Sequence, residues 1–267
     1  MLRQSAVAGQ FYPDDPRQLA GMIDAFLKTG AEPTEALLAI CPHAGYVYSG
    51  AVAGRVLSRV AVPRKVVVLG PNHRGVGRRL AVMTEGAWLT PLGQVEIDTA
   101  LGRDLVATCA LAENDALAHK LEHSLEVQVP FLQRLRPDLL LTPVCVSMLT
   151  YDECATVGQA LARVIEQAGE PVLMVASTDM THYESAEAAR AKDELAIKQM
   201  LELNPEGLYK VVRDHDISMC GVLATTIALE AALGLGASRS ELVAYTNSGE
   251  VSGDFRQVVG YAGIIIS

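Results

Sequence analysis

The sequence lacks the long apolar run that a secretory signal or a membrane helix requires. Its first residues, MLRQSAVAGQFYPDDP, contain no apolar core, and no uninterrupted apolar stretch approaches the roughly 20 residues of a membrane span. We therefore expect a cytoplasmic protein with no membrane partner.

Cysteine is scarce and irregularly spaced. The chain has five cysteines and no CxxC pair: Cys41, Cys109, Cys145, Cys154 and Cys220. An odd number in a chain without a secretory signal favours reduced thiols over a disulfide framework. Most of them are expected to be small buried side chains, and the sequence by itself favours that role for Cys220 too.

The sequence has fewer basic than acidic residues and no nucleotide-binding motif. Lys and Arg number 22 against 31 Asp and Glu, giving a net charge of −9. Phosphate backbones are bound by clustered basic side chains, and the only cluster here, around Arg74, Arg78 and Arg79, is short, so we expect no nucleic-acid partner. There is no P-loop and no GxGxxG after a strand, and no GxSxG motif surrounds Ser177, which argues against a serine hydrolase.

What the chain does contain is alternating strand-like and helix-like segments. Half of the residues are hydrophobic and a fifth are charged, as in a folded domain with a sizeable core. Buried strands are predicted at Leu37–Cys41, Lys65–Gly70, Leu139–Val146, Pro171–Ser177 and Val258–Ile266, with weaker signals at Leu80–Thr84 and Tyr245–Ser248. Helices are predicted at Ala51–Val60, Ser124–Arg134, Asp152–Ala168, Ala186–Leu203 and Val222–Leu233. This alternation predicts an α/β sandwich formed by one domain over residues 1–267.

Three of the six histidines follow predicted strands. His43 follows LLAIC, His73 follows VVVLG and His182 follows VLMVAS. The carboxyl edge of an open α/β sheet is where ligands and catalytic groups gather, and imidazole is the commonest metal ligand. These residues can also be ordinary turn histidines, but their shared position favours a common site.

Two more segments carry polar groups in apolar surroundings. In LEHSLEVQVPFL, Ser124 can cap a helix, and His123 and Glu126 share a helix face, so both can point into one pocket or Glu126 can face solvent. In SMCGVLATT, Cys220 opens an apolar helix, where the helix dipole favours a thiolate.

Taken in order, these motifs resemble the Memo family. AVAGQFYP, PHAGYVYSG, LGPNH, LTPLG, EHSLEVQVPFL, STDMTHY and MCG span nearly the whole chain. Prokaryotic members are labelled protein B of the AmmeMemoRadiSam system, which implies a functional link to a radical-SAM protein and an AMMECR-type protein. The family's fold is similar to the catalytic subunit of class III extradiol dioxygenases, which implies a three-layer α/β/α sandwich around a central, largely parallel mixed sheet.

The resemblance also implies a site. His43 and His73 match the two histidine ligands of the dioxygenases' mononuclear non-haem iron, and His182 matches their acid/base histidine. The third ligand differs, because Cys220 stands where those enzymes have a carboxylate. A His₂Cys set suits Fe(II), which we favour, and also Cu or Zn.

Three functions follow from this site as expectations. The first is a metal-dependent redox enzyme of small-molecule substrates, in which His182 transfers a proton and Asp179 or His123 orients ligands or substrate. The second is a hydrolase with Zn²⁺ at the same ligands and His182 as the base. The third is an adaptor that retains the pocket and binds a protein partner. The thiolate makes standard catechol cleavage a poor expectation.

Overall fold

The structure is a computed structural model that describes residues 1–28, 30 and 32–267. Its helices are α1 (Pro16–Leu27), α2 (Tyr46–Leu57), α3 (Thr99–Thr108), α4 (Val129–Leu135), α5 (Tyr151–Gln167), α6 (Ala186–Leu201), α7 (Pro205–Asp214), α8 (Val222–Gly234) and α9 (Gly249–Ser252), with a 3-10 turn at Glu126–Gln128. Its strands are β1 (Leu2–Arg3), β2 (Leu38–Cys41), β3 (Lys65–Pro71), β4 (Leu80–Val82), β5 (Ala87–Thr90), β6 (Gly93–Ile97), β7 (Glu113–Asn114), β8 (Leu140–Val146), β9 (Val172–Ser177), β10 (His182–Glu184), β11 (Ser240–Asn247) and β12 (Val258–Ile266).

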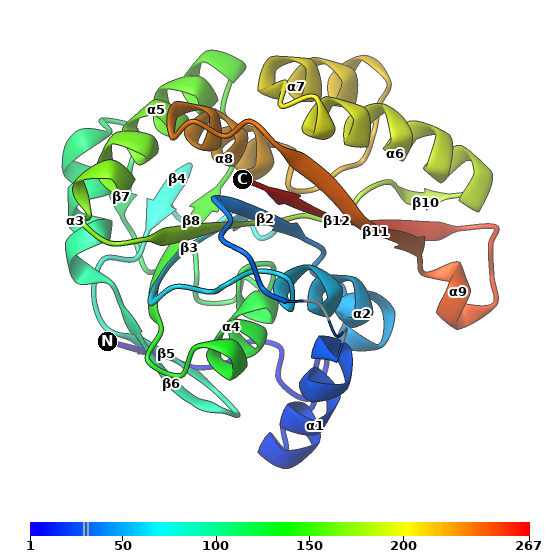
Figure 1. The fold of residues 1–267 in the computed structure, drawn as a ribbon, viewed down its shortest axis with the longest axis horizontal. Coiled ribbons are helices and arrows are strands. Elements are labelled where there is room, and N and C mark those ends of the chain that lie inside the picture. Colours follow the sequence, from blue (N-terminus) through cyan, green and yellow to red (C-terminus); the bar gives the residue numbers. More distant parts are fainter. Residues whose placement is uncertain (29, 31) are drawn as a thin grey trace.

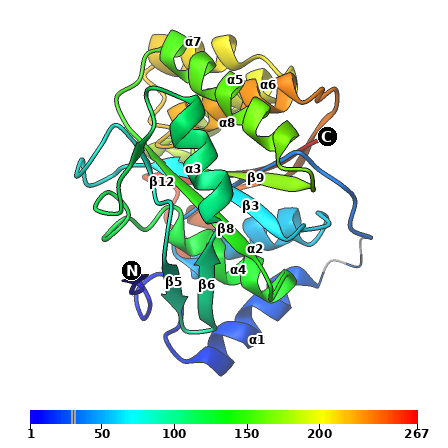
Figure 2. The same cartoon turned by 90° about the vertical axis from the view of Figure 1, so that its left-hand side faces the viewer.

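The strands form one mixed sheet between two layers of helices. Its order is β1-β5-β6-β8-β3-β9-β2-β12-β10, with β11 beside β12 and β4 beside β8. The central neighbours β8, β3, β9 and β2 run parallel, and β12 pairs antiparallel with β2. Helices α3, α5, α6, α7 and α8 cover one face, and α1, α2 and α4 cover the other (Figures 1 and 2). The predicted three-layer α/β/α fold with a largely parallel sheet is confirmed.

The central strands are apolar at every position because both of their faces are covered. In β3, Val67 and Leu69 pack into the core beneath α5 and α8, whereas Val66 and Val68 pack into the core beneath α2 and α4. Successive side chains of a strand point to opposite faces, so a strand between two helical layers needs a continuous apolar run. The central strands could therefore be predicted from the continuous apolar runs in the sequence.

Two predicted helices begin at different places. Helix α2 begins at Tyr46 rather than Ala51, inside the PHAGY motif, with Gly45 as its N-cap. The segment predicted as a helix from Ser124 opens as a 3-10 turn, and α4 begins only at Val129. Pro130 explains the change, because it has no N–H to donate to the carbonyl four residues earlier.

The close packing of α2 on α1 gives a stability prediction. A Cβ added at Gly54 would lie 2.6 Å from Cβ and 2.7 Å from the carbonyl oxygen of Phe26. We expect Gly54→Ala to lower the free energy of unfolding by about 1–3 kcal/mol, since overpacking forces backbone shifts. Gly21→Ala in α1 is the matched control, because nothing lies within 4 Å of an added Cβ there. It should raise the free energy of unfolding by about 0.4–1 kcal/mol. Urea denaturation measures both, and equal losses would contradict the packing argument.

Candidate metal centre

Three neighbouring parallel strands deliver side chains to one edge of the sheet. Strands β3, β9 and β2 are adjacent, and their registers keep their carboxyl ends close to one another. His43 follows β2, His73 follows β3 and Asp179 follows β9. Cys220 reaches the same edge from the loop before α8.

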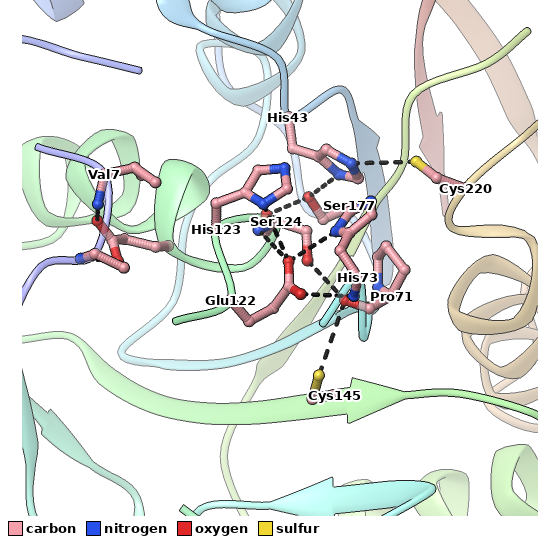
Figure 3. A network of polar contacts seen from close by, with 12 residues as sticks. Val7, His43, Pro71, His73, Glu122, His123, Ser124, Cys145, Ser177 and Cys220 are labelled. Carbon is pink, nitrogen blue, oxygen red and sulfur yellow. Dashed lines mark hydrogen bonds and ion pairs between the residues drawn. The ribbon is translucent and has the colours of Figure 1, made fainter. Parts of the chain in front are cut away.

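His43, His73 and His123 form a group that can hold one metal ion. One ligand nitrogen from each ring lies within 4.8 Å of those from the other two. The ring centroids of His73 and His123 are 4.5 Å apart, and His43 lies 5.2 Å from His73 and 5.5 Å from His123 (Figure 3). His43 is buried and His73 is the most exposed of the three, so the group opens to solvent on the His73 side. Convergent imidazoles are a donor set that suits zinc, iron or copper.

The Glu122 carboxylate lies between His73 and His123 (Figure 3). Its Oε1 accepts a hydrogen bond from Nδ1 of His73 at 2.8 Å and lies 3.4 Å from Nδ1 of His123. Since a carboxylate only accepts, His73 carries its proton on Nδ1 and its Nε2 lone pair remains free. Burial opposes ionisation of Glu122, but the hydrogen bond from the His73 ring and the hydrogen bond from the Ser124 backbone N–H favour the carboxylate, and the pKa of Glu122 is lowered to about 2. Glu122 is therefore an anion at neutral pH.

A buried serine orients His43 in the same way. The Ser177 hydroxyl donates to the Ser124 carbonyl at 2.6 Å and accepts from Nε2 of Gln128 at 2.9 Å. With its only proton used, Ser177 can contact Nδ1 of His43, 3.0 Å away, only as an acceptor. His43 therefore carries its proton on Nδ1, and its Nε2 is available as a ligand atom.

The buried histidines are neutral at pH 7. Burial lowers the pKa of His43 well below its usual range, and the nearby rings of His123 and His73 lower it further. Burial also lowers the pKa of His123 to about 4, although the Glu122 carboxylate opposes this shift. Neutral imidazole is the form that binds a metal ion.

Cys220 lies beside the three-histidine group without belonging to it. Its Sγ is 3.1 Å from Nε2 of His43 and accepts from the Asp179 backbone N–H at 3.2 Å. Metal–sulfur and metal–nitrogen bonds are about 2.3 and 2.0 Å, so a thiolate and an imidazole on one ion lie about 3–3.5 Å apart. The observed spacing fits such a pair. Burial raises the pKa of the Cys220 thiol, and a bound cation would favour its thiolate.

Asp179 supports the turn that carries His43. Its carboxylate accepts from the His43 backbone N–H at 2.7 Å, and burial raises its pKa to about 7. The carboxylate faces backbone rather than the histidine rings, so its contacts are those of a residue that positions His43.

His182 lies at the same edge but outside the three-histidine group. Its Nδ1 donates to the Ser218 carbonyl at 3.0 Å, and its backbone N–H donates to the Ser218 hydroxyl at 2.7 Å. The proton of the neutral His182 ring therefore lies on Nδ1, and Nε2 is its basic nitrogen. Burial lowers the pKa of His182, and the nearby His182 ring contributes to the lowered pKa of His43.

The sequence prediction and the structural group share two members. His43 and His73 belong to both sets, whereas His123, predicted in a supporting role, takes the third place in the group, and Cys220 contacts it at His43. Glu122 and the orienting role of Ser177 were missed, although Glu122 stands beside His123 in the quoted EHS motif. The predicted cap at Ser124 is wrong, because its hydroxyl donates to the Pro71 carbonyl instead.

Glu126 does not point into the site and does not face solvent. It is fully buried and forms an ion pair with Arg3, 2.6 Å apart. The prediction that Glu126 shares a pocket with His123 therefore fails, because the chain turns between the two residues.

No helix in the described part of the chain is long and apolar enough to cross a membrane.

Known proteins resemble this chain over nearly its whole length. A family model described as Memo-like protein matches residues 3–265. A MEMO1 family protein of Methanopyrus kandleri is 42% identical over 99% of both chains, and one of Aquifex aeolicus is 44% identical over 99% of this chain and 98% of the relative. The crystal structure of an uncharacterized Escherichia coli K12 protein, JW3007, aligns with a TM-score of 0.53 at 14% identity and covers 86% of this chain and 100% of that chain. That likeness concerns the fold alone. The chain belongs to the family of Memo-like proteins.

Proposed function

We propose that this protein is a metal-dependent redox enzyme with one mononuclear non-haem metal ion at the edge of β2, β3 and β9. The observation that carries the proposal is the convergence of His43, His73 and His123, whose ligand nitrogens lie within 4.8 Å of one another. Cys220 adds a soft donor 3.1 Å from His43, which favours Fe(II) or Cu over a hard cation such as Mg²⁺.

Each residue at the edge has a role in this proposal. His43 and His73 hold the ion, and Cys220 or His123 completes the set. When bound, the ion supplies Lewis-acid and redox chemistry toward O₂ or an organic substrate. His182 takes up or returns a proton at Nε2, the basic nitrogen of its ring. Asp179 holds the His43 backbone and thereby keeps that ligand in place.

A zinc-dependent hydrolase is the second candidate, because three histidines are also the ligand set of some catalytic zinc sites. In this case His182 acts as the base toward water. The identity of the bound metal separates the two candidates.

The first test is the metal content of anaerobically purified protein. We expect about one redox-active metal per chain, as in mononuclear centres of this class. Cys220→Ala should lower that content or change the optical spectrum, since a thiolate ligand gives charge-transfer absorption. Cys154→Ala, which changes a buried thiol in α5, is the matched control and should leave both unchanged. Zinc at the same stoichiometry would support the hydrolase, and a well-folded wild type that binds no metal would leave only a binding protein.

A further inference from the structure

We propose that Glu122 is the positioning residue of the metal centre, where its single carboxylate orients both His73 and His123. This inference rests on the proposed metal site and adds to it a residue that controls how tightly the ion is held.

The contacts of Glu122 fix His73 at two points. Oε2 accepts from the His73 backbone N–H at 2.7 Å, and Oε1 accepts from the His73 ring at 2.8 Å. Oε1 also accepts from the Ser124 N–H at 2.8 Å, which fixes the carboxylate to its own loop. With backbone and ring held by the same group, the His73 side chain has little freedom to rotate.

The same oxygen serves the second ring. Oε1 lies 3.4 Å from Nδ1 of His123, and the rings of His73 and His123 are stacked at an interplanar angle of 24°. Two imidazoles that turn Nδ1 toward one anchor turn their Nε2 atoms away from it. One carboxylate therefore presents two ligand atoms on the same side.

The charge of Glu122 supports this role. Its side chain is 1% exposed, and no lysine or arginine side chain pairs with its carboxylate within residues 1–28, 30 and 32–267. A buried carboxylate is costly unless a cation or hydrogen bonds compensate it. Two backbone N–H groups compensate part of this cost, and its side-chain partners are the imidazoles of the three-histidine group, so a divalent ion held by those rings would add the positive charge that no lysine or arginine supplies. Carboxylate–histidine–metal arrangements of this kind raise ligand basicity and fix the tautomer.

The first experiment is a Co²⁺ titration of the wild type, Glu122→Gln and Asp98→Asn, followed by visible absorption. Glutamine keeps the shape of Glu122 but has only one acceptor oxygen. Its NH₂ group must therefore face an N–H group that now donates a hydrogen bond to the carboxylate. We expect Glu122→Gln to bind Co²⁺ about 10–100-fold more weakly, the usual cost of losing such a partner. Asp98 is the matched control, a buried carboxylate that caps α3 and pairs with Lys65 at the opposite end of β3. Asp98→Asn should retain wild-type affinity, and equal affinities for all three proteins would overturn the proposal.

The second experiment uses metal-free protein, so that it does not depend on the metal proposal. Histidine-labelled protein in excess chelator is measured by ¹⁵N NMR. In the wild type His73 should carry its proton on Nδ1, and in Glu122→Ala, which removes the acceptor altogether, it should shift toward the Nε2-protonated form, which cannot bind a metal through that atom. An unchanged tautomer would overturn the proposal even if affinity fell. If the wild type binds no Co²⁺, the proposed function fails, and the NMR result still decides the role of Glu122.

Discussion

Replacing His43 with alanine should weaken Co²⁺ binding by more than about 100-fold, since losing a ligand costs more than the 10–100-fold that accompanies loss of a ligand's supporting partner. His43 belongs to the three-histidine group and also contacts Cys220. His43 follows β2 whereas His73 follows β3, so the remaining histidines cannot supply a ligand nitrogen from the position of His43.

The loss can be followed without a known substrate. A ligand that binds only the folded state stabilises it, by about 2.7 kcal/mol at a concentration 100 times its Kd. Co²⁺ should therefore raise the Tm of the wild type and leave that of His43→Ala almost unchanged. His215→Ala is the control, because His215 is exposed at the end of α7, outside the group. A His43→Ala protein that keeps the wild-type Tm shift would place the metal elsewhere.

The same Co²⁺ titration identifies the third ligand. If Cys220→Ala and His123→Ala are compared, the variant with the larger loss of affinity identifies the residue that completes the set with His43 and His73. The geometry offers both, since His123 stacks on His73 and the Cys220 sulfur lies beside His43.

The sheet and the position of the site could be predicted because both depend on simple patterns. Strands β2, β3 and β9 are buried on both faces, so each reads as an apolar run, and the first polar residues after it must lie at the sheet edge. His43 and His73 are such residues. Their convergence follows once the strands are parallel neighbours.

The supporting residues could not be predicted because their roles depend on which way a loop turns. Glu122, His123 and Glu126 stand within one short segment, yet Glu122 faces the histidines and Glu126 faces the N-terminal segment. Helical spacing placed His123 and Glu126 together, but the segment before Pro130 forms a 3-10 turn. The short strands β5 and β6 were not predicted, because β5 has only four residues and β6 alternates between buried and more exposed positions.

Glu126 carries the largest stability prediction. Its carboxylate accepts from Arg3 and from the Tyr12 hydroxyl, each at 2.6 Å, and from the backbone N–H groups of Ala6 and Val7 at 2.8 and 3.1 Å. Glu126→Ala would leave the Arg3 guanidinium, itself 4% exposed, without its ion pair. Breaking a buried pair from one side costs about 3–5 kcal/mol, and the two orphaned N–H groups add to it. Urea denaturation should show a loss of at least that size.

An exposed ion pair provides the comparison. Arg190 and Glu194 are neighbours on α6 with side chains more than half exposed, so Glu194→Ala should change the free energy of unfolding by about 0.3–0.5 kcal/mol. A loss below about 1 kcal/mol for Glu126→Ala would contradict the burial argument.

The result also bears on the site, because the segment held by Glu126 contains Phe11, whose ring lies 4.8 Å from that of His123. If Glu126→Ala also weakens Co²⁺ binding, the N-terminal segment helps to hold His123. If it does not, Glu122 is sufficient to hold that ring.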